Sequence, residues 1–198
     1  ERRRVAPHTD RWFGDLTWAP DGDTLFAVAD EDGAAPVFRI DLGEQPDSDE
    51  VTRLTAAGAH NTLRLSSDGS VLYALRSAWD EAPQPVRLDT NKSSTGQHPE
   101  PLPNPSAGIE LPGTLERIET TAADGTRIPS WIVLPDGASA DSPAPFVLWA
   151  HGGPLGSWNA WSWRWSPWLL AARGYAVLLP DPAFSTGYGQ EFIDRGWG

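Results

Sequence analysis

The chain has 198 residues without cysteine, and its 27 acidic and 15 basic residues give a formal net charge of −12 at pH 7. The absence of cysteine excludes disulfides, thiolate metal sites and a cysteine nucleophile within this sequence. An acidic surface repels phosphate backbones, and no apolar run approaches the roughly 20 residues that span a bilayer. We therefore expect no nucleic-acid partner and no membrane partner, and we favour a soluble, cytoplasmic protein. The first residue is Glu1 rather than Met, so we expect the native start, with any signal peptide, to lie upstream.

A strand–turn–strand pattern occurs twice in the first hundred residues. The two Asp-Gly turns, Asp21-Gly22 and Asp68-Gly69, lie 47 residues apart. Runs rich in β-branched and aromatic residues flank each turn and recur later in each unit. These runs cover residues 16–18, 24–29, 37–42, 63–65, 71–76 and 85–89. A period in the forties with several short strands is typical of a β-propeller blade, and two unrelated hairpins are the alternative.

Prolines are frequent between residues 80 and 113, where seven of them occur. Proline cannot donate to a sheet ladder and favours extended, unpaired backbone. We therefore predict a linker or crossing segment here, polar and flexible around residues 91–96. The predicted domains are a partial propeller of about two blades with this segment, residues 1–111, and a second domain, residues 112–198.

The second domain mixes strands with one helix. Strands are expected at residues 115–120 and 128–134, and the wholly apolar run 146–150 predicts a strand buried on both faces of a mainly parallel sheet. Ser166-Pro167 supplies an N-cap and a proline for a helix over residues 168–173, and a further buried strand follows at 175–179. The predicted fold class is all-β propeller blades followed by the N-terminal part of an α/β-hydrolase domain.

The motif His151-Gly152-Gly153-Pro154 follows the apolar run directly. A strand that ends in a His-Gly-Gly loop before a helix is how many α/β-hydrolases build half of an oxyanion hole. A backbone N–H can approach a developing alkoxide at glycine because no Cβ blocks it. We predict an oxyanion loop in which the Gly153 N–H is the main donor and Gly152 lies beside it. The alternative is a plain turn that ends the strand.

His151 has two possible roles. Histidine titrates near neutral pH and can act as a general base, but in hydrolases of this type the base follows the nucleophile in the sequence. We therefore favour a role in shaping the loop. No Gly-x-Ser-x-Gly occurs in the 198 residues, so we expect the nucleophile, acid and base beyond Gly198 and the chain alone to be inactive. No metal and no cofactor is expected, because neither a ligand cluster nor a phosphate-binding loop is present.

Seven of the eleven tryptophans lie between residues 149 and 197. They form either an aromatic wall for a hydrophobic or proline-containing substrate or the packing of loop and helix against the rest of the protein. Packing is favoured for the group as a whole, and Trp158 is the best candidate for facing the site.

Residues 115–198 resemble the start of the catalytic domain of the prolyl oligopeptidase family, in its acylaminoacyl-peptidase and dipeptidyl-aminopeptidase-like branch. Residues 151–158 are similar to the oxyanion loop of that branch, 169–177 to its first helix and next strand, and 182–190 to the following loop. The repeats upstream agree with the propeller that covers such a domain.

This resemblance implies a serine peptidase that acts on short or acylated peptides through a Ser-His-Asp triad. It implies Gly153 as a backbone oxyanion donor and places Pro154, Trp158 and Tyr188 at the substrate. Two positions depart from the family pattern. His151 stands where prolyl oligopeptidase uses a tyrosine hydroxyl, and Pro182-Ala183-Phe184-Ser185 stands where members often have Pro-Arg-Gly-Ser.

Two other functions remain open. A carboxylesterase would use the same loop and would prefer esters to peptides. A non-catalytic propeller scaffold would lack Gly-x-Ser-x-Gly in the sequence downstream. The assembly state is not predicted.

Overall fold

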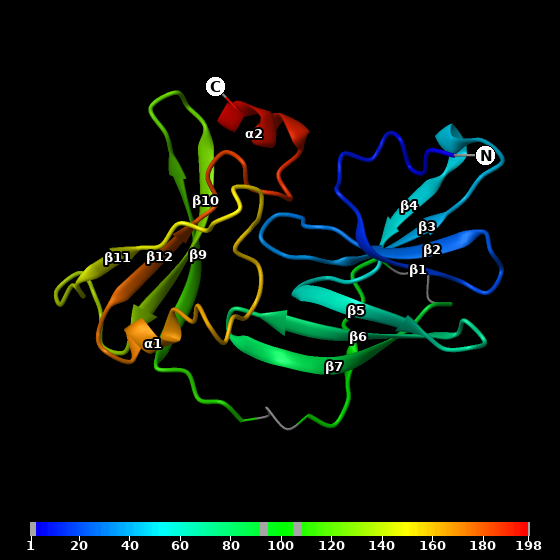
Figure 1. Cartoon of the computed structure of the whole chain (residues 1–198). Coiled ribbons are helices and arrows are strands. Elements are labelled where there is room, and N and C mark those ends of the chain that lie inside the picture. The colour runs from blue at the N-terminus through cyan, green and yellow to red at the C-terminus, as the bar shows by residue number, and fades with distance from the viewer. Residues whose placement is uncertain (1–2, 92–94, 105–107, 198) are drawn as a thin grey trace.

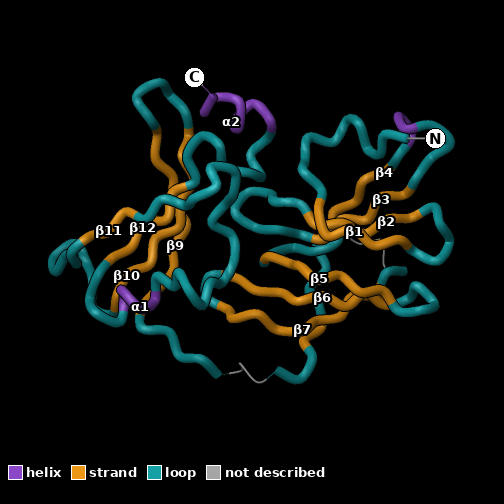
Figure 2. Tube along the Cα trace, in the orientation of Figure 1, coloured by secondary structure: helices purple, strands orange, loops and turns teal. Residues whose placement is uncertain are grey.

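The computed structural model describes residues 3–91, 95–104 and 108–197. Both ends of the chain, including Glu1 and Gly198, and part of the predicted linker lie outside these ranges. Strands dominate the described residues and form three four-stranded sheets. Figure 1 shows two of these sheets, built from the first half of the chain, on the right, and the third on the left. Figure 2 shows that α1 and α2 both belong to the half of the molecule that holds the third sheet.

The first sheet is an antiparallel meander in chain order, with each strand bonded to the next. Its strands are β1 (Gly14–Trp18), β2 (Thr24–Val28), β3 (Val37–Asp41) and β4 (Glu50–Arg53), and the 3-10 helix η1 (Pro46–Ser48) precedes β4. The predicted Asp-Gly turn joins β1 to β2. The Asp21 carboxylate accepts hydrogen bonds from the backbone N–H groups of Asp23 (2.9 Å) and Thr24 (3.0 Å), and Gly22 has a φ of 78°.

The second sheet repeats this arrangement. Its strands are β5 (Ala59–Leu65), β6 (Val71–Ala78), β7 (Glu81–Asp89) and β8 (Glu100–Pro101). The second predicted turn joins β5 to β6, and the Asp68 carboxylate accepts from the Ser66 hydroxyl (2.6 Å) and the Ser70 N–H (3.1 Å). The two Asp-Gly turns therefore begin equivalent hairpins.

The strand expected at residues 85–89 forms as part of β7, but the prediction that prolines interrupt the ladder from residue 80 onward is wrong for this strand. This strand runs through Pro83 and Pro85, and Pro85 pairs with Leu75 of β6. The carbonyl of Pro85 accepts a hydrogen bond from the N–H of Leu102 (2.9 Å) on the side away from β6. The missing amide proton of Pro85 faces that same side, so the pairing with β6 loses no bond.

The third sheet has the order β11-β12-β10-β9. Its strands are β9 (Gly113–Thr121), β10 (Arg127–Pro135), β11 (Phe146–Leu148) and β12 (Ala176–Pro180). Only the β11–β12 pair is parallel, and the other two pairs are antiparallel. The sheet is therefore mixed, and the prediction of a mainly parallel sheet is wrong.

The prediction that residues 146–150 form a strand buried on both faces is also wrong. The strand β11 covers only residues 146–148, and Phe146 and Leu148 are 58% and 59% exposed. The reason is topological, because β11 lies at the end of the strand order and has β12 as its only neighbour among the described residues.

The helices are short. They are α1 (Trp168–Ala171), α2 (Gln190–Asp194) and the 3-10 helix η2 (Arg195–Trp197). The helix predicted over residues 168–173 ends at Ala171, and the chain then turns at Gly174, which has a φ of 83°. In the described ranges no helix is long and apolar enough to cross a bilayer.

A tryptophan of the second sheet enters the core of the third. Trp79 lies between β6 and β7, is 3% exposed and packs with Trp168, Val133, Val177 and Leu179. The indole N–H of Trp168 donates to the carbonyl of Trp79 at 2.6 Å. The two halves of the chain therefore share one apolar cluster below the loop that follows β11.

Candidate active site

Two residues separate the end of β11 from the loop at residues 151–154. Gly152 and Gly153 are exposed, and among the hydrogen bonds of the described residues neither glycine N–H is a donor. Gly153 has a φ of 138°, and a Cβ placed there would lie 2.6 Å from the carbonyl oxygen of Leu155. This position therefore requires glycine, and both amides are available to an external acceptor.

Both nitrogens of the His151 ring have hydrogen-bond partners inside the protein. Its side chain is 9% exposed, Nε2 lies 2.8 Å from the Ser185 hydroxyl, and Nδ1 lies 3.1 Å from the Gly152 carbonyl. Ser185 is completely buried, so its hydroxyl is not accessible to a substrate. These contacts agree with a histidine that shapes the loop.

Asp181 is a buried carboxylate next to this loop that the sequence analysis did not single out. It is 2% exposed, and one oxygen accepts from the hydroxyls of Ser157 (2.8 Å) and Tyr188 (2.7 Å). The other oxygen accepts from the N–H of Trp158 at 2.9 Å and lies 3.8 Å from His151 Nε2. Its place directly after β12 was an available signal, because polar groups at the carboxyl ends of parallel strands often form sites.

Within the described part of the chain, the Tyr188 hydroxyl is connected to the loop through Asp181. Burial, followed by the negative charge of Asp181, raises the pKa of the tyrosine well above its usual value, so the hydroxyl stays protonated and donates to Asp181. The hydroxyl of this predicted substrate-binding residue is therefore already engaged inside the protein.

Trp158 packs against its neighbours. Its ring centroid lies 5.5 Å from that of Trp79, 6.4 Å from that of Trp149 and 6.0 Å from that of His151. Its indole nitrogen is buried without a hydrogen-bond partner among the described residues. Pro154 lies on the open side of the loop and is exposed.

The other tryptophans of this region fall into two groups. Trp168 is buried and Trp161 packs against the same apolar cluster, whereas Trp163 and Trp165 are 63% and 51% exposed. Trp197 is also exposed, at 62%, so packing accounts for part of the group and three rings remain open to solvent.

A connection in the first sheet contacts the same region. Asp30 follows β2, and its carboxylate accepts from the Asn159 side-chain amide (2.7 Å) and from the Thr186 hydroxyl. Burial raises the pKa of Asp30, while these two hydrogen bonds oppose the rise. The N–H of Asp32 donates to the carbonyl of Gly187 at 3.1 Å. The loops that follow β11 and β12 are therefore both tied to the first sheet.

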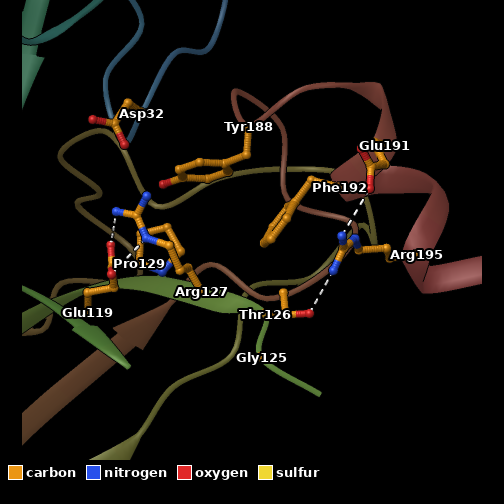
Figure 3. A pocket seen from close by; sticks show the side chains of 10 residues that line it. All are labelled: Asp32, Glu119, Gly125, Thr126, Arg127, Pro129, Tyr188, Glu191, Phe192 and Arg195. Carbon is orange, nitrogen blue, oxygen red and sulfur yellow. Dashed lines mark hydrogen bonds and ion pairs between the residues drawn. The ribbon is translucent and has the colours of Figure 1, made fainter. Parts of the chain in front are cut away.

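A cavity of about 410 Å³ lies between the β9–β10 hairpin and α2, and Figure 3 shows that the ring of Tyr188 forms part of its wall. Its two arginines are already paired. Arg127 donates to Glu119 at 2.7 Å, and Arg195 donates to Glu191 at 2.9 Å. The described residues contain no group of three or more histidine and carboxylate side chains that could hold a metal ion.

The chain is similar in sequence to curated peptidases. It is 31% identical over 205 residues to dipeptidyl-peptidase 5 of Arthroderma otae, covering 99% of this chain and 27% of the relative. It is 32% identical over 207 residues to dipeptidyl-peptidase 5 of Trichophyton schoenleinii, with the same coverage. The chain thus spans about a quarter of the length of these relatives. No protein-family model matches it.

Solved peptidase structures share its fold. The acylaminoacyl peptidase of Pyrococcus horikoshii superimposes with a TM-score of 0.73 at 14% identity, over 96% of this chain and 28% of the other. A prolyl endopeptidase structure gives a TM-score of 0.66 at 17% identity, over 95% and 27% of the two chains. Sequence and fold agree: nearly the whole chain is similar to part of dipeptidyl-peptidase 5 and shares the fold of part of acylaminoacyl and prolyl peptidase structures.

Proposed function

We propose that the protein is a serine-type peptidase that hydrolyses short or acylated peptides and uses the loop at residues 151–154 as part of its oxyanion hole. The observation that carries this proposal is the pair of glycine amides that follow β11 and donate to no described group. The names of the relatives, which are dipeptidyl and acylaminoacyl peptidases, support a peptide substrate.

The proposed architecture assigns a domain to each part of the chain. Residues 1–111 would be a partial propeller in which β1–β4 and β5–β8 are two blades, supported by two equivalent four-stranded meanders. Residues 112–198 would be the N-terminal part of an α/β-hydrolase domain, supported by the parallel β11–β12 pair with a helix in its crossover. A cytoplasmic location is a further prediction, which cell fractionation would test.

The proposed chemistry begins when a serine attacks the carbonyl carbon of the scissile bond. The carbonyl oxygen becomes negative in the tetrahedral intermediate, and the Gly153 N–H would donate to it. One such donor is worth about 2.7–4 kcal/mol of the barrier. The second donor in hydrolases of this type is the N–H of the residue after the nucleophile, and we place both, with the Asp and His of the triad, in sequence outside these 198 residues.

Activity of the full-length protein tests this proposal. We expect a fluorophosphonate probe to label one serine, and we expect dipeptidyl and acyl-aminoacyl p-nitroanilides to be hydrolysed through an acyl-enzyme. Matched p-nitrophenyl esters of the same peptides are the control. Hydrolysis of the esters without the anilides would identify a carboxylesterase, and absence of both labelling and turnover would identify a non-catalytic scaffold.

A further inference from the structure

The oxyanion loop is held on one side by a single carboxylate. Asp181 accepts from Ser157 and Trp158, which follow the loop at residues 151–154, and from Tyr188 in the segment that follows β12. The backbone N–H of Asp181 donates to the carbonyl of Pro129 at 2.9 Å, which fixes this carboxylate to the inner strand β10. The hydrogen bonds of Asp181 therefore connect residues 157 and 158 to the third sheet.

The beginning of the loop is held by the same segment. His151 lies 2.8 Å from the buried hydroxyl of Ser185, and the N–H of Thr186 donates to the carbonyl of Gly156 at 2.9 Å. Residues 181–186 therefore contact both ends of the stretch that carries Gly152 and Gly153, while the two glycines themselves stay unbonded and exposed.

A contribution to stability does not explain why the Asp181 carboxylate is so deeply buried. Its only basic partner in the described parts of the chain is His151, at 3.8 Å, and a buried charge is weak evidence for stabilisation because of its desolvation. Its three donors are instead arranged as charge-assisted hydrogen bonds, which are short and directional. Such an arrangement defines the position of a loop more sharply than apolar packing does.

We propose that Asp181 is a positioning residue for the oxyanion loop, which it holds so that the Gly152 and Gly153 amides face the reacting carbonyl without Asp181 touching the substrate. This inference rests on the proposed peptidase function. A displacement of about 1 Å in such a site can lower the rate about 100-fold. We therefore expect Asp181 to affect the rate of the catalysed reaction and not the affinity for the substrate.

The test is the Asp181→Asn variant of the full-length protein. Asparagine has nearly the same shape, but its amide nitrogen cannot accept, so at least one donor loses its partner. We expect kcat per titrated active site to fall about 10- to 100-fold with KM changed less than about threefold. Affinity for a peptide boronate, which forms a tetrahedral adduct, should fall in parallel with kcat.

Asp49→Asn is the matched control, because the Asp49 side chain is likewise buried and accepts two backbone N–H bonds, but from Ala6 and Gly43 (3.0 Å each) in the first half of the chain instead of from Ser157 and Trp158. We expect its kcat to stay within about threefold of wild type. A merely structural role of Asp181 would lower the fraction of folded protein and leave kcat per titrated site unchanged.

The outcomes separate the two proposals. An inactive wild-type protein would overturn the peptidase function, and the positioning role with it. An active wild type with unchanged kcat and boronate affinity in Asp181→Asn would overturn the positioning role alone. If Asp181→Asn does not fold, Ser157→Ala and Tyr188→Phe each remove one donor, and unchanged kcat in both would overturn the positioning role equally.

Discussion

Phe184 carries an unfavourable backbone conformation where the family resemblance leads one to expect glycine. Its φ is 80°, in the left-handed region, which costs a residue with a Cβ about 1–2 kcal/mol. Its ring centroid lies 4.8 Å from that of Trp197 in an edge-to-face contact. Aromatic pairs of this kind contribute about 0.5–1.5 kcal/mol beyond the area that they bury, so the contact offsets much of the backbone cost.

Two substitutions of Phe184 in the full-length protein separate these effects. Phe184→Ala and Phe184→Gly both remove the ring, but only glycine relieves the left-handed backbone. We expect Phe184→Gly to be the more stable of the two by about 1 kcal/mol, measured as the higher melting temperature. Equal melting temperatures, or a higher value for the alanine variant, would contradict the left-handed backbone conformation that we describe for Phe184.

At the scale of the elements, His60 joins the first sheet to the second. It lies on β5 and is 3% exposed. Its backbone N–H donates to the carbonyl of Ala35, between β2 and β3, at 2.9 Å, and its ring Nδ1 lies 3.0 Å from the same oxygen. Burial lowers the pKa of His60 from its usual 6.5 to about 4. The contact between the sheets is therefore made by a neutral imidazole.

The lowered pKa of His60 predicts the pH dependence of stability. Between pH 6.5 and 4 the unfolded chain takes up a proton at His60 that the folded protein does not. The contribution of His60 to the free energy of unfolding is therefore complete above pH 6.5 and is lost as the pH falls toward 4. We expect His60→Asn to reduce the difference between melting temperatures at pH 7.5 and 4.5 in the full-length protein. An unchanged difference would contradict a histidine buried in its neutral form.

Local patterns predicted most of the elements. The Asp-Gly turns and the alternating runs beside them depend on neighbouring residues, and the strands flanking Asp21 and Asp68 formed as expected. The burial of β11 depends instead on how many strands lie beside it, which an apolar run does not reveal. Likewise Pro85 was misinterpreted because its effect depends on which side of β7 faces a neighbour.

The candidate site was predictable in part for the same reason. The His151-Gly152-Gly153-Pro154 motif is contiguous, so its chemistry could be inferred from the sequence. Asp181 was missed because its donors lie 7 to 24 positions away and come together only when the loops after β11 and β12 meet. The one local signal was its position directly after β12, which does not reveal its partners.

At the scale of the whole molecule, both sheets of the first half support the loop after β11. The first sheet contributes Asp30, which bonds Asn159 and Thr186, and the second contributes Trp79, which packs on Trp158 and accepts from Trp168. The first half of the chain therefore helps to form the surroundings of the candidate site, in addition to lying beside it.

The central claim is that the Gly153 amide receives the negative charge of the reacting carbonyl. The most direct measurement compares kcat of Gly153→Ala with that of Gly152→Ala in the full-length protein. A Cβ at Gly153 would lie 2.6 Å from the Leu155 carbonyl oxygen, whereas a Cβ at Gly152 meets nothing within 4 Å. We expect kcat to fall about 100- to 1,000-fold for Gly153→Ala and less than about tenfold for Gly152→Ala, and a Gly153→Ala variant with wild-type kcat would contradict the account.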